Sequence, residues 1–446
     1  MMRKTRGAAL VALGASFALL AGCGGGDSTD GGTTGAATGA ATGGATGGGE
    51  AVAMTFWHNS TTGEGRQYWE DTVADFEAAN PGVTIEIQAI QNEDLDGKLQ
   101  TALNSGDAPD IFMQRGGGKL ADMVAAGQVM DIADMIDDAT KTAVGEGAFG
   151  AYTIDGAIYA MPTSILPGGM FYTESLFEDA GIETPPATFE EMNDAVAKLK
   201  ETGVEPIALG GKDAWPAAHW YYFFALRQCS QEALENTLAT KDFSDACWLR
   251  AGESLADFAA TEPFNQGFLT TSAQQGAGSS AGLVANYQAA MELMGAWNTG
   301  VIRSLTPDQQ DLPDLNWFPF PAVEGGEGDP KAMMGGVDGF SCAASAPAEQ
   351  CTAFLNFFMQ QEYQEGYATA FGTIPTSQDA QGVVELESIK SILEAYNEAP
   401  YVVLWLDTHL GQNVGNALNA GVVEMLAGNG TPEGIIQAVS DAAARG

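Results

Sequence analysis

The spacing of apolar and polar residues predicts alternating strands and helices after residue 50. Residues 83–90 alternate apolar with polar side chains, as a half-buried β-strand does. Residues 65–79 instead repeat apolar positions with helical spacing, and Asn80-Pro81-Gly82 ends that helix in a turn. The other elements predicted in this part are strands at 51–57 and 109–113 and helices at 92–103 and 120–126. Strand, helix, strand, helix, strand is the order of a parallel sheet covered by helices, so the predicted class is α/β.

The same kind of pattern continues to the C-terminus without a repeat of fixed period. Further strands are predicted at 155–161, 170–172, 207–209, 290–297, 315–320 and 333–341. Further helices are predicted at 189–200, 217–226, 249–260, 352–359, 387–398, 415–427 and 432–444. Thr188 and Glu191 form a capping-box pattern at the start of the first of these helices. Residues 276–282 are predicted to form a loop rich in Gly and Ser.

The first residues of the chain carry the pattern of an export signal. Arg3, Lys4 and Arg6 precede an apolar run at 8–20, which is too short for a comfortable membrane span. The run ends in Leu-Ala-Gly-Cys at 20–23, which resembles a bacterial lipobox, where the signal is cut before a lipid-bearing cysteine. We therefore expect a signal peptide at 1–22 and lipidation at Cys23. An ordinary signal peptide followed by a chance cysteine is the alternative.

A tether is predicted between that cysteine and the folded body. Residues 24–49 are almost wholly Gly, Ala and Thr, which cannot bury enough apolar surface to offset the entropy of ordering them. A segment of this length has a mean span of roughly 28 Å. We assign 23–50 to the lipidated cysteine and its tether, and expect the chain to be held at the extracellular face of the cell membrane through its lipid alone.

The composition argues against two classes of partner. The chain carries 18 basic and 58 acidic residues, for a formal net charge of −40. Nucleic-acid binding needs a basic footprint, and anionic lipid also attracts basic segments, so neither is an expected partner. The body of about 400 residues is longer than one usual domain and suggests two lobes.

The cysteines predict disulfides. With Cys23 assigned to the lipobox, Cys229, Cys247, Cys342 and Cys351 remain, an even number in an exported chain. Pairing of nearest neighbours would join Cys229 to Cys247 and Cys342 to Cys351. A zinc site built from all four is the alternative, but the spacings lack the C-x2-C pattern.

Other motifs give no sign of an enzyme, a cofactor or a metal. The stretch GEGAFG at 145–150 follows a predicted helix and precedes a strand, the reverse of a dinucleotide site. GGGKL at 116–120 lacks the Ser or Thr and the first Gly of a P-loop. His58, His219 and His409 are the only histidines and lie too far apart in sequence to suggest a metal site.

An ordered series of stretches resembles a known family. These stretches are MTFWHNSTTGEGRQYWEDTVADFEAANPGVTIEI (54–87), SGDAPDIFMQRGGGKLADMVAAGQVMDI (105–132), IYAMPTSILPGGMFYTESLFEDAGIETPPATFEEM (158–192), GAWNTG (295–300), GGVDGFS (335–341) and GTIPTSQDA (372–380). In this order they resemble the extracellular solute-binding proteins of ABC importers, in the sugar-binding branch typified by maltodextrin-binding proteins. The resemblance covers almost the whole body.

This resemblance implies a fold of two α/β lobes joined by crossing strands, with a hinge and a ligand cleft between the lobes. Carried onto this chain, lobe one would hold 51–160 and 323–360, and lobe two 161–322 and 361–446. The lobes would close over a mono- or oligosaccharide, and the closed monomer would deliver it to the permease subunits of an ABC importer.

The candidate binding residues follow predicted strands, because ligands of α/β sheets sit beyond the carboxyl ends of strands. A sugar needs planar polar groups for its hydroxyls and flat aromatic rings for its faces. The polar candidates are His58, Asn59, Gln114, Arg115, Gly116 and Asp338. Arg115 could instead bridge the lobes, Asp338 could stabilise a turn, and Gly116 to Gly118 would let a ligand or the other lobe approach closely.

The aromatic candidates are Trp215, Trp297 and Trp405, which match places where family members set an aromatic ring against sugar. Tyr172 and His219 are weaker candidates. A tryptophan at a strand end can equally belong to the core. Two other functions stay open: binding of a non-sugar solute such as a polyamine or phosphodiester, and an exported glycoside hydrolase, which would need two carboxylates about 5–10 Å apart.

Overall fold

The computed structural model describes residues 51–445, which lie within one unit, Gly49–Gly446. The expected signal peptide (1–22), the lipidated Cys23 and the tether (23–50) lie outside the described residues. The first elements are β1 (Val52–His58), α1 (Gly63–Ala79), β2 (Val83–Ala89), α2 (Asn92–Ser105), β3 (Ile111–Gln114), α3 (Gly117–Ala125), η1 (Ala133–Met135), α4 (Asp138–Val144), α5 (Glu146–Phe149), η2 (Gly150–Tyr152), β4 (Thr153–Ile154), β5 (Ala157–Ile158) and β6 (Met161–Thr173).

The middle of the chain is mainly helical. Its elements are α6 (Glu174–Asp179), α7 (Phe189–Thr202), β7 (Glu205–Ala208), η3 (Gly211–Asp213), α8 (Trp215–Gln228), α9 (Gln231–Thr240), α10 (Ala246–Ala260), η4 (Phe268–Thr270), α11 (Ser280–Ala285), β8 (Ala289–Gly295), α12 (Asn298–Leu305) and β9 (Leu315–Phe318). The last elements are β10 (Met333–Cys342), α13 (Ala348–Phe358), α14 (Gln361–Phe371), β11 (Ile374–Pro375), η5 (Gln378–Val383), α15 (Glu387–Glu398), β12 (Val402–Leu404), α16 (Leu406–His409), α17 (Gln412–Leu426) and α18 (Pro432–Ala444).

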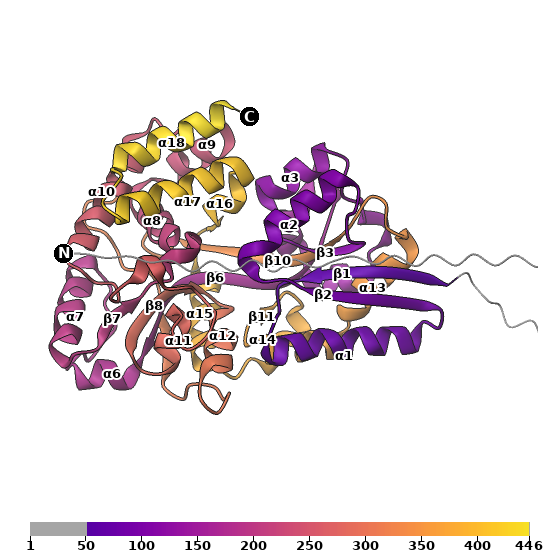
Figure 1. The fold of residues 1–446 in the computed structure, drawn as a ribbon, viewed down its shortest axis with the longest axis horizontal. Coiled ribbons are helices and arrows are strands. Elements are labelled where there is room, and N and C mark those ends of the chain that lie inside the picture. The colour runs from indigo at the N-terminus through magenta and orange to yellow at the C-terminus, as the bar shows by residue number, and fades with distance from the viewer. Residues whose placement is uncertain (1–50, 446) are drawn as a thin grey trace, which may run out of the picture. The chain divides into compact units, whose positions relative to one another are not determined.

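One mixed sheet runs through these elements in the order β2-β1-β3-β10-β6-β8-β7. β1 pairs in parallel with both β2 and β3, so the strand–helix–strand order predicted from the sequence forms the expected parallel sheet. β6 changes partners along its length: Met161–Pro167 pair with β10 and Gly168–Tyr172 with β8. β10 likewise pairs with β3 near its end and with β12 at its start. β6 and β10 therefore cross from one half of the sheet to the other (Figure 1).

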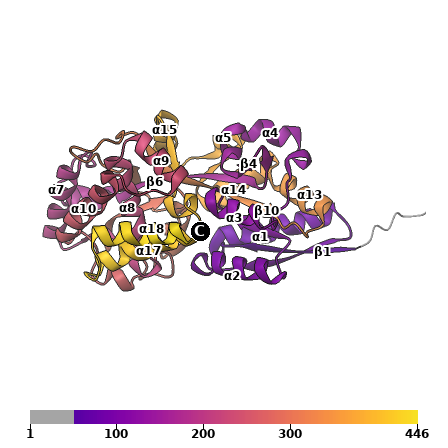
Figure 2. The ribbon, with the colours of Figure 1, turned by 90° about the horizontal axis from the view of Figure 1, so that it is seen from above.

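The two largest of four hydrophobic clusters in residues 51–445 lie at either end of these crossing strands. The first is built around Phe56, Trp69 and Phe354, under β1, β3, α1 and α13. The second is built around Trp220 and Phe224 on α8, a helix whose side chains after Trp215 are all buried. We call the elements around these cores lobe one and lobe two. In both views the elements of lobe one gather around β1 and those of lobe two around α8 (Figures 1 and 2).

The lobe boundaries expected from the sequence remain a prediction. The packing of the side chains favours a later position for two of them. Helix α14 lies against α1, where Tyr367 and Phe371 pack on Tyr68, so residues 361–371 belong with the core of lobe one. Residues 323–334 contribute Ala332 and Met334 to the core of lobe two. The crossing points thus fall about ten residues later than the resemblance implied at each of these two boundaries.

Several predicted elements differ from those observed. The strand predicted at 155–161 is a hairpin, β4–β5, whose turn has Asp155 and Gly156 at φ 51° and 85°. The short strand predicted at 170–172 is the end of the 13-residue β6, which Pro162 and Pro167 conceal in the sequence pattern. The loop predicted at 276–282 contains the start of α11, capped by the Ser279 hydroxyl. Helix α12, directly after Trp297, was not predicted.

Both predicted disulfides are present. Cys229 pairs with Cys247 between the end of α8 and the start of α10, and Cys342 pairs with Cys351 between β10 and α13. The first bond lies in lobe two and the second in lobe one. Because all four cysteines are used in these bonds, the alternative of a four-cysteine zinc site is excluded.

Candidate functional site

A cleft of about 850 Å³ lies between the lobes and is lined by both of them and by the crossing strands. Lobe one contributes the start of α1, the start of α2 and the loop from β3 into α3. Lobe two contributes the first turns of α8 and α12, together with α16 and α17. Ser164 and Leu166 on β6 and Gly336 to Asp338 on β10 form the floor. The volume is in the range of small-molecule binding sites.

The side of the cleft formed by lobe two carries an aromatic wall of Trp215, His219, Trp297 and Trp405. The His219 and Trp405 rings are stacked, with centroids 4.3 Å apart and planes 8° apart. Trp297 lies 5.8 Å from Trp405 and 6.1 Å from Trp215, measured between centroids. Trp215 and Trp297 are only partly buried, so their rings present surface to the cleft. Such a wall offers flat apolar surface with N–H groups at its edges.

The three tryptophans of this wall lie at the starts of helices, and two of them follow strands. Trp297 follows β8 and precedes α12, and Trp405 follows β12 and precedes α16. Trp405 also packs over Gly168 and Gly336 of the crossing strands, where a Cβ atom would come within 2.7 Å of the indole. Trp215 begins α8 after Ala214, which is held at φ 63° and ψ −51°, a conformation costly for a residue with a side chain. Positions beyond strands are where the sequence analysis placed ligand contacts.

Polar groups on this wall have no protein partner. The indole Nε1 of Trp215 and the Nδ1 of His219 are buried and make no hydrogen bond within the described residues. Burial lowers the pKa of His219 to about 4, an effect that the nearby Asp407 only partly offsets. The imidazole is therefore neutral at physiological pH and can donate from one nitrogen and accept at the other. Both residues therefore line the cleft while holding a buried polar atom that no described residue satisfies.

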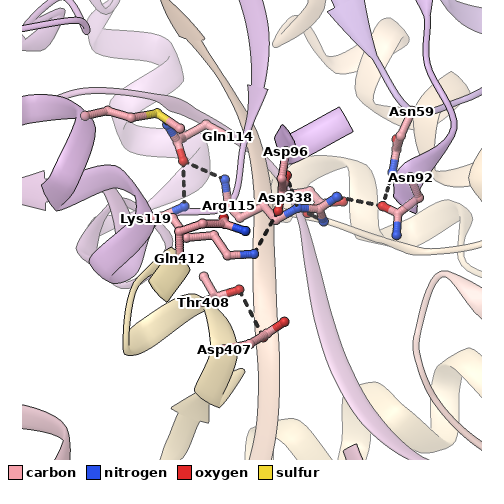
Figure 3. A network of polar contacts seen from close by, with 12 residues as sticks. Asn59, Asn92, Asp96, Gln114, Arg115, Lys119, Asp338, Asp407, Thr408 and Gln412 are labelled. Atoms are coloured by element: carbon pink, nitrogen blue, oxygen red, sulfur yellow. Dashed lines mark hydrogen bonds and ion pairs between the residues drawn. The ribbon is translucent and has the colours of Figure 1, made fainter. Parts of the chain in front are cut away.

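The opposite side of the cleft carries a polar wall centred on Arg115 (Figure 3). Arg115 donates to Asn92 Oδ1 at 2.6 Å and to Asp96 Oδ1 at 3.3 Å. Lys119 donates to the other carboxylate oxygen of Asp96 at 2.8 Å. Asp338 on β10 lies 3.8 Å from the Arg115 guanidinium. Asn59 joins the network by donating to Asn92 at 3.2 Å.

The opposite charges of this polar wall stabilise the charged forms of Asp96 and Arg115. Burial would raise the pKa of Asp96, but Lys119 and Arg115 outweigh it and hold that pKa well below its usual range. Burial likewise acts against the charge of Arg115, but Asp96 and Asp338 outweigh it and raise its pKa. Asp338 behaves differently: burial outweighs Arg115 and raises its pKa to about 6. Asp338 is therefore the carboxylate of this wall that titrates closest to neutral pH.

Local backbone features place Arg115 and Asp338. The side-chain carbonyl of the buried Gln114 accepts hydrogen bonds from the backbone N–H groups of Arg115 and Gly116, at 2.8 and 3.2 Å. Asp338 lies at a shift of register between β10 and β6, and such irregularities turn a side chain out of the ladder. The glycine run after Arg115 lets lobe two approach, since a Cβ on Gly118 would lie 2.4 Å from the carbonyl oxygen of His409.

Of the ten expected ligand residues, six line the cleft: Asn59, Arg115, Trp215, Trp297, Asp338 and Trp405. The weaker candidate His219 also lines it. The other four are His58, Gln114, Gly116 and Tyr172. The structure places Gln114 and Gly116 behind the cleft surface, in the loop that supports Arg115.

His58 and Tyr172 lie in the cores. His58 is 1% exposed and packs on Phe56, while its Nδ1 accepts from the backbone N–H of Ser60 at 3.1 Å. Burial, reinforced by Arg66, lowers the pKa of His58 to about 3, so the ring is neutral. Tyr172 is buried at the far end of β6, against Phe177 and Phe318. Neither belongs to the cleft lining.

The polar residues of the cleft that were not among the candidates include Asn92, Asp96, Lys119 and Asp407. The first two lie on α2 and Lys119 lies on α3, whereas most of the candidates were residues that follow predicted strands. Lys119 stands in the glycine-rich stretch that was tested only as a phosphate loop. Asp96 is one of 58 acidic residues, and no pattern in the sequence distinguishes it. Asp407 follows the expected Trp405 by two residues, and this was the one available signal.

Direct contacts also join the lobes across the cleft. Arg303 on α12 forms an ion pair with Glu64 on α1, at 2.9 Å. Arg303 also donates to the carbonyl oxygens of Thr369 and Ala370 on α14, at 3.1 and 2.6 Å. Gln275 of lobe two donates to Glu93 of lobe one at 3.0 Å. In residues 51–445, no cluster of His, Cys, Asp and Glu is placed to bind a metal ion.

Two lobes joined by crossing strands, with an aromatic wall facing a polar wall, define a receptor that encloses a small solute. The chain belongs to the bacterial extracellular solute-binding protein family, whose family model matches residues 59–365. The family resemblance noted in the sequence is thereby confirmed, and with it the predicted two-lobe α/β fold. The expectation that the chain is not an enzyme agrees with its relatives, which are named as binding proteins.

Known relatives are similar over most of the chain. The diacetylchitobiose binding protein DasA of Streptomyces coelicolor is 27% identical over 84% of this chain and 82% of its own. A solved chitin oligosaccharide binding protein is 25% identical, with a TM-score of 0.80 over 89% of this chain and 99% of its own. A structure from a study of xylan utilization by Caldanaerobius polysaccharolyticus is 25% identical, with a TM-score of 0.81 over 87% of this chain and 99% of its own.

Proposed function

We propose that this chain is a carbohydrate receptor of an ABC importer, which captures a mono- or oligosaccharide in the cleft between its lobes. The observation that carries the proposal is the aromatic wall of Trp215, Trp297 and Trp405 facing the polar wall of Arg115 and Asp338 in one cleft. Sugar rings offer C–H faces to tryptophan and hydroxyls to planar polar groups. The names of the relatives, which include a diacetylchitobiose and a chitin oligosaccharide receptor, support the same class of ligand.

The binding step follows from the arrangement of the two walls. The aromatic wall belongs to lobe two and most of the polar wall to lobe one, so a sugar is held on both sides only when the lobes are close together. The crossing strands β6 and β10 provide the hinge, and Arg303 and Gln275 hold the closed form through their contacts with lobe one. Ligand contacts made only in the closed form shift the population toward it.

Delivery requires a membrane partner and a means of staying near it. We propose that the closed monomer docks on the permease subunits of the importer and releases its sugar there. Lipidation at Cys23 after removal of residues 1–22, with 23–50 as a tether, would keep the receptor at the extracellular face of the membrane. None of the helices within residues 51–445 is long and apolar enough to cross a bilayer.

The proposal is tested by a thermal-shift screen of residues 50–446 against mono- and oligosaccharides. A ligand that binds only the folded state stabilises it by about 2.7 kcal/mol at a hundredfold excess over Kd. We expect a rise in melting temperature with one group of related sugars, and recovery of those sugars unchanged after incubation. A flat response to every sugar, with a shift caused by polyamines or other solutes, would redirect the assignment; conversion of the sugar would point to a hydrolase.

A further inference from the structure

We infer that the cleft selects saccharides that carry no carboxylate, sulfate or phosphate group, and discriminates against acidic sugars by charge. This inference rests on the proposed function and names the class of saccharide that the same site takes. It follows from how the charged side chains of the cleft are paired. The pairing differs between the basic and the acidic residues.

Every basic side chain that lines the cleft is already paired with protein carboxylates. Arg115 pairs with Asp96 and Asp338, at 3.3 and 3.8 Å. Lys119 pairs with Asp96 at 2.8 Å. Arg303 pairs with Glu64 and Asp311, at 2.9 and 3.6 Å, and is also bonded to two carbonyl oxygens. An acidic sugar would therefore have to compete with a protein carboxylate for its cation.

Several acidic side chains of the cleft have no such partner. Within the described residues, Glu93, Asp213, Asp308 and Asp407 line the cleft and form no ion pair. Asp407 lies beside the aromatic wall, two residues after Trp405, and its side-chain contacts within residues 51–445 are long, to Thr408 at 3.5 Å and Asn419 at 3.4 Å. The cleft therefore carries a surplus of negative charge next to the surface that would face the sugar.

This surplus acts oppositely on hydroxyls and on acidic groups. A carboxylate accepts hydrogen bonds from sugar hydroxyls, which is favourable for a neutral ligand. A second negative charge placed beside it in a partly buried cleft is repelled, and such like-charge contacts suppress the binding of the wrong ligand. The formal net charge of −40 adds a long-range repulsion that salt screens. The aromatic wall offers only indole N–H groups and a neutral His219, none of which carries a charge to offset it.

The test compares three forms of one sugar by titration calorimetry of residues 50–446 at pH 7.5. The forms are the neutral saccharide identified by the screen, its uronate, in which one CH2OH is a carboxylate, and the corresponding uronamide, which has the same shape without the charge. We expect the uronate to bind at least about 100-fold more weakly than the uronamide, and this ratio to shrink as salt is raised.

The variant Asp407→Asn tests the residue behind the effect. We expect it to lower the ratio of the Kd for the uronate to the Kd for the uronamide by about tenfold. The matched control is Asp441→Asn on α18, an exposed carboxylate outside the cleft, which should leave the ratio unchanged. A melting scan of each variant establishes that it is folded before titration.

The outcomes separate this inference from the function beneath it. Equal affinity for the uronate and the uronamide would overturn charge selection and leave the carbohydrate receptor standing. A ratio that Asp407→Asn does not change would overturn the electrostatic origin assigned here. Failure of every saccharide to bind, neutral or acidic, would overturn the proposed function together with the inference.

Discussion

Arg115 and Asp338 lie 3.8 Å apart and join the polar wall of lobe one to the crossing strand β10. Arg115 is positioned by the loop that ends β3, whereas Asp338 is positioned by an irregularity in the pairing of β10 with β6. The candidate site thus lies where the lobes meet the strands that connect them. Any movement about those strands would change the separation of the two walls, and this is how the proposed closure would be coupled to ligand contact.

Ligand affinity should fall as the pH drops below about 6. Burial raises the pKa of Asp338 to about 6, despite the opposing effect of Arg115, so Asp338 is charged above that pH and protonated below it. Protonation removes a strong acceptor for sugar hydroxyls and weakens the hold on Arg115. We expect the Kd for the sugar to rise several-fold from pH 7.5 to pH 5, measured by titration calorimetry. Asp338→Asn should bind weakly and show no inflection near pH 6; an unchanged inflection in that variant would assign it to another group.

Removing Arg303 should favour the open form. Arg303→Ala loses the ion pair to Glu64 and two hydrogen bonds to α14, all of which join lobe two to lobe one. We expect the Kd to rise by about tenfold and the compaction on adding ligand, measured by small-angle X-ray scattering, to diminish. Arg250→Ala is the matched control, because Arg250 pairs with Glu327 at 2.7 Å within lobe two. Identical behaviour of the two variants would rule out Arg303 as a closure contact.

Glu292 should make the folded protein less stable as the pH rises. Its side chain on β8 is 1% exposed, with one oxygen bonded to Asn298 at 2.7 Å and the other without a partner among residues 51–445. Burial outweighs its hydrogen bonds and raises its pKa to about 7, above the ordinary value of 4.5. The folded state therefore binds this proton more tightly than the unfolded state, so the stability it contributes is complete below about pH 4.5 and is lost as the pH rises through about 7.

The variant Glu292→Gln cannot titrate and should remove this dependence. Denaturant unfolding should show that it gains on the order of 2–3 kcal/mol relative to wild type between pH 5 and pH 8. Glu253→Gln, at an exposed position on α10, is the control and should follow wild type. A Glu292→Gln variant whose stability runs parallel to wild type over this range would contradict the assignment.

The bond between Cys229 and Cys247 should contribute stability without affecting binding. It joins residues 18 apart in lobe two, and neither cysteine lines the cleft. Replacing both by Ser should lower the free energy of unfolding by about 3 kcal/mol, measured by denaturant unfolding. The Kd for the sugar, measured well below the transition, should match wild type. A large loss of affinity in the folded variant would show that this bond also shapes the site.

The sequence predicts the fold well where the spacing of apolar residues matches only one kind of secondary structure. The order β1, α1, β2, α2, β3 was predicted because each apolar pattern there matches one kind of element. The crossing strand β6 was not recognised, because Pro162 and Pro167 interrupt its pattern while a partner strand on each side keeps it extended. Its partner β10 was predicted as a strand, but its role in joining the lobes depends on pairings between distant residues.

The site was predicted in part for a related reason. Trp297 and Trp405 were expected at the cleft because they match places where the resembled family sets aromatic rings, and both line it. Asp96 and Lys119 were missed because helices bring them to the cleft, and their pairing with Arg115 exists only in three dimensions. His58 was misplaced because a polar residue after a strand can also turn into the core, where its ring packs on Phe56 and Trp69.

The most direct test of carbohydrate capture is a calorimetric titration of residues 50–446 and of the variant Trp297→Ala with the sugar identified by the screen. We predict saturable binding at one site, weakened at least about 30-fold in Trp297→Ala, as for an aromatic residue at the centre of a site. Trp248→Phe, in the core of lobe two and outside the cleft, should bind as wild type does. Absence of saturable binding by any sugar, or equal affinity in the folded Trp297→Ala variant, would contradict the account.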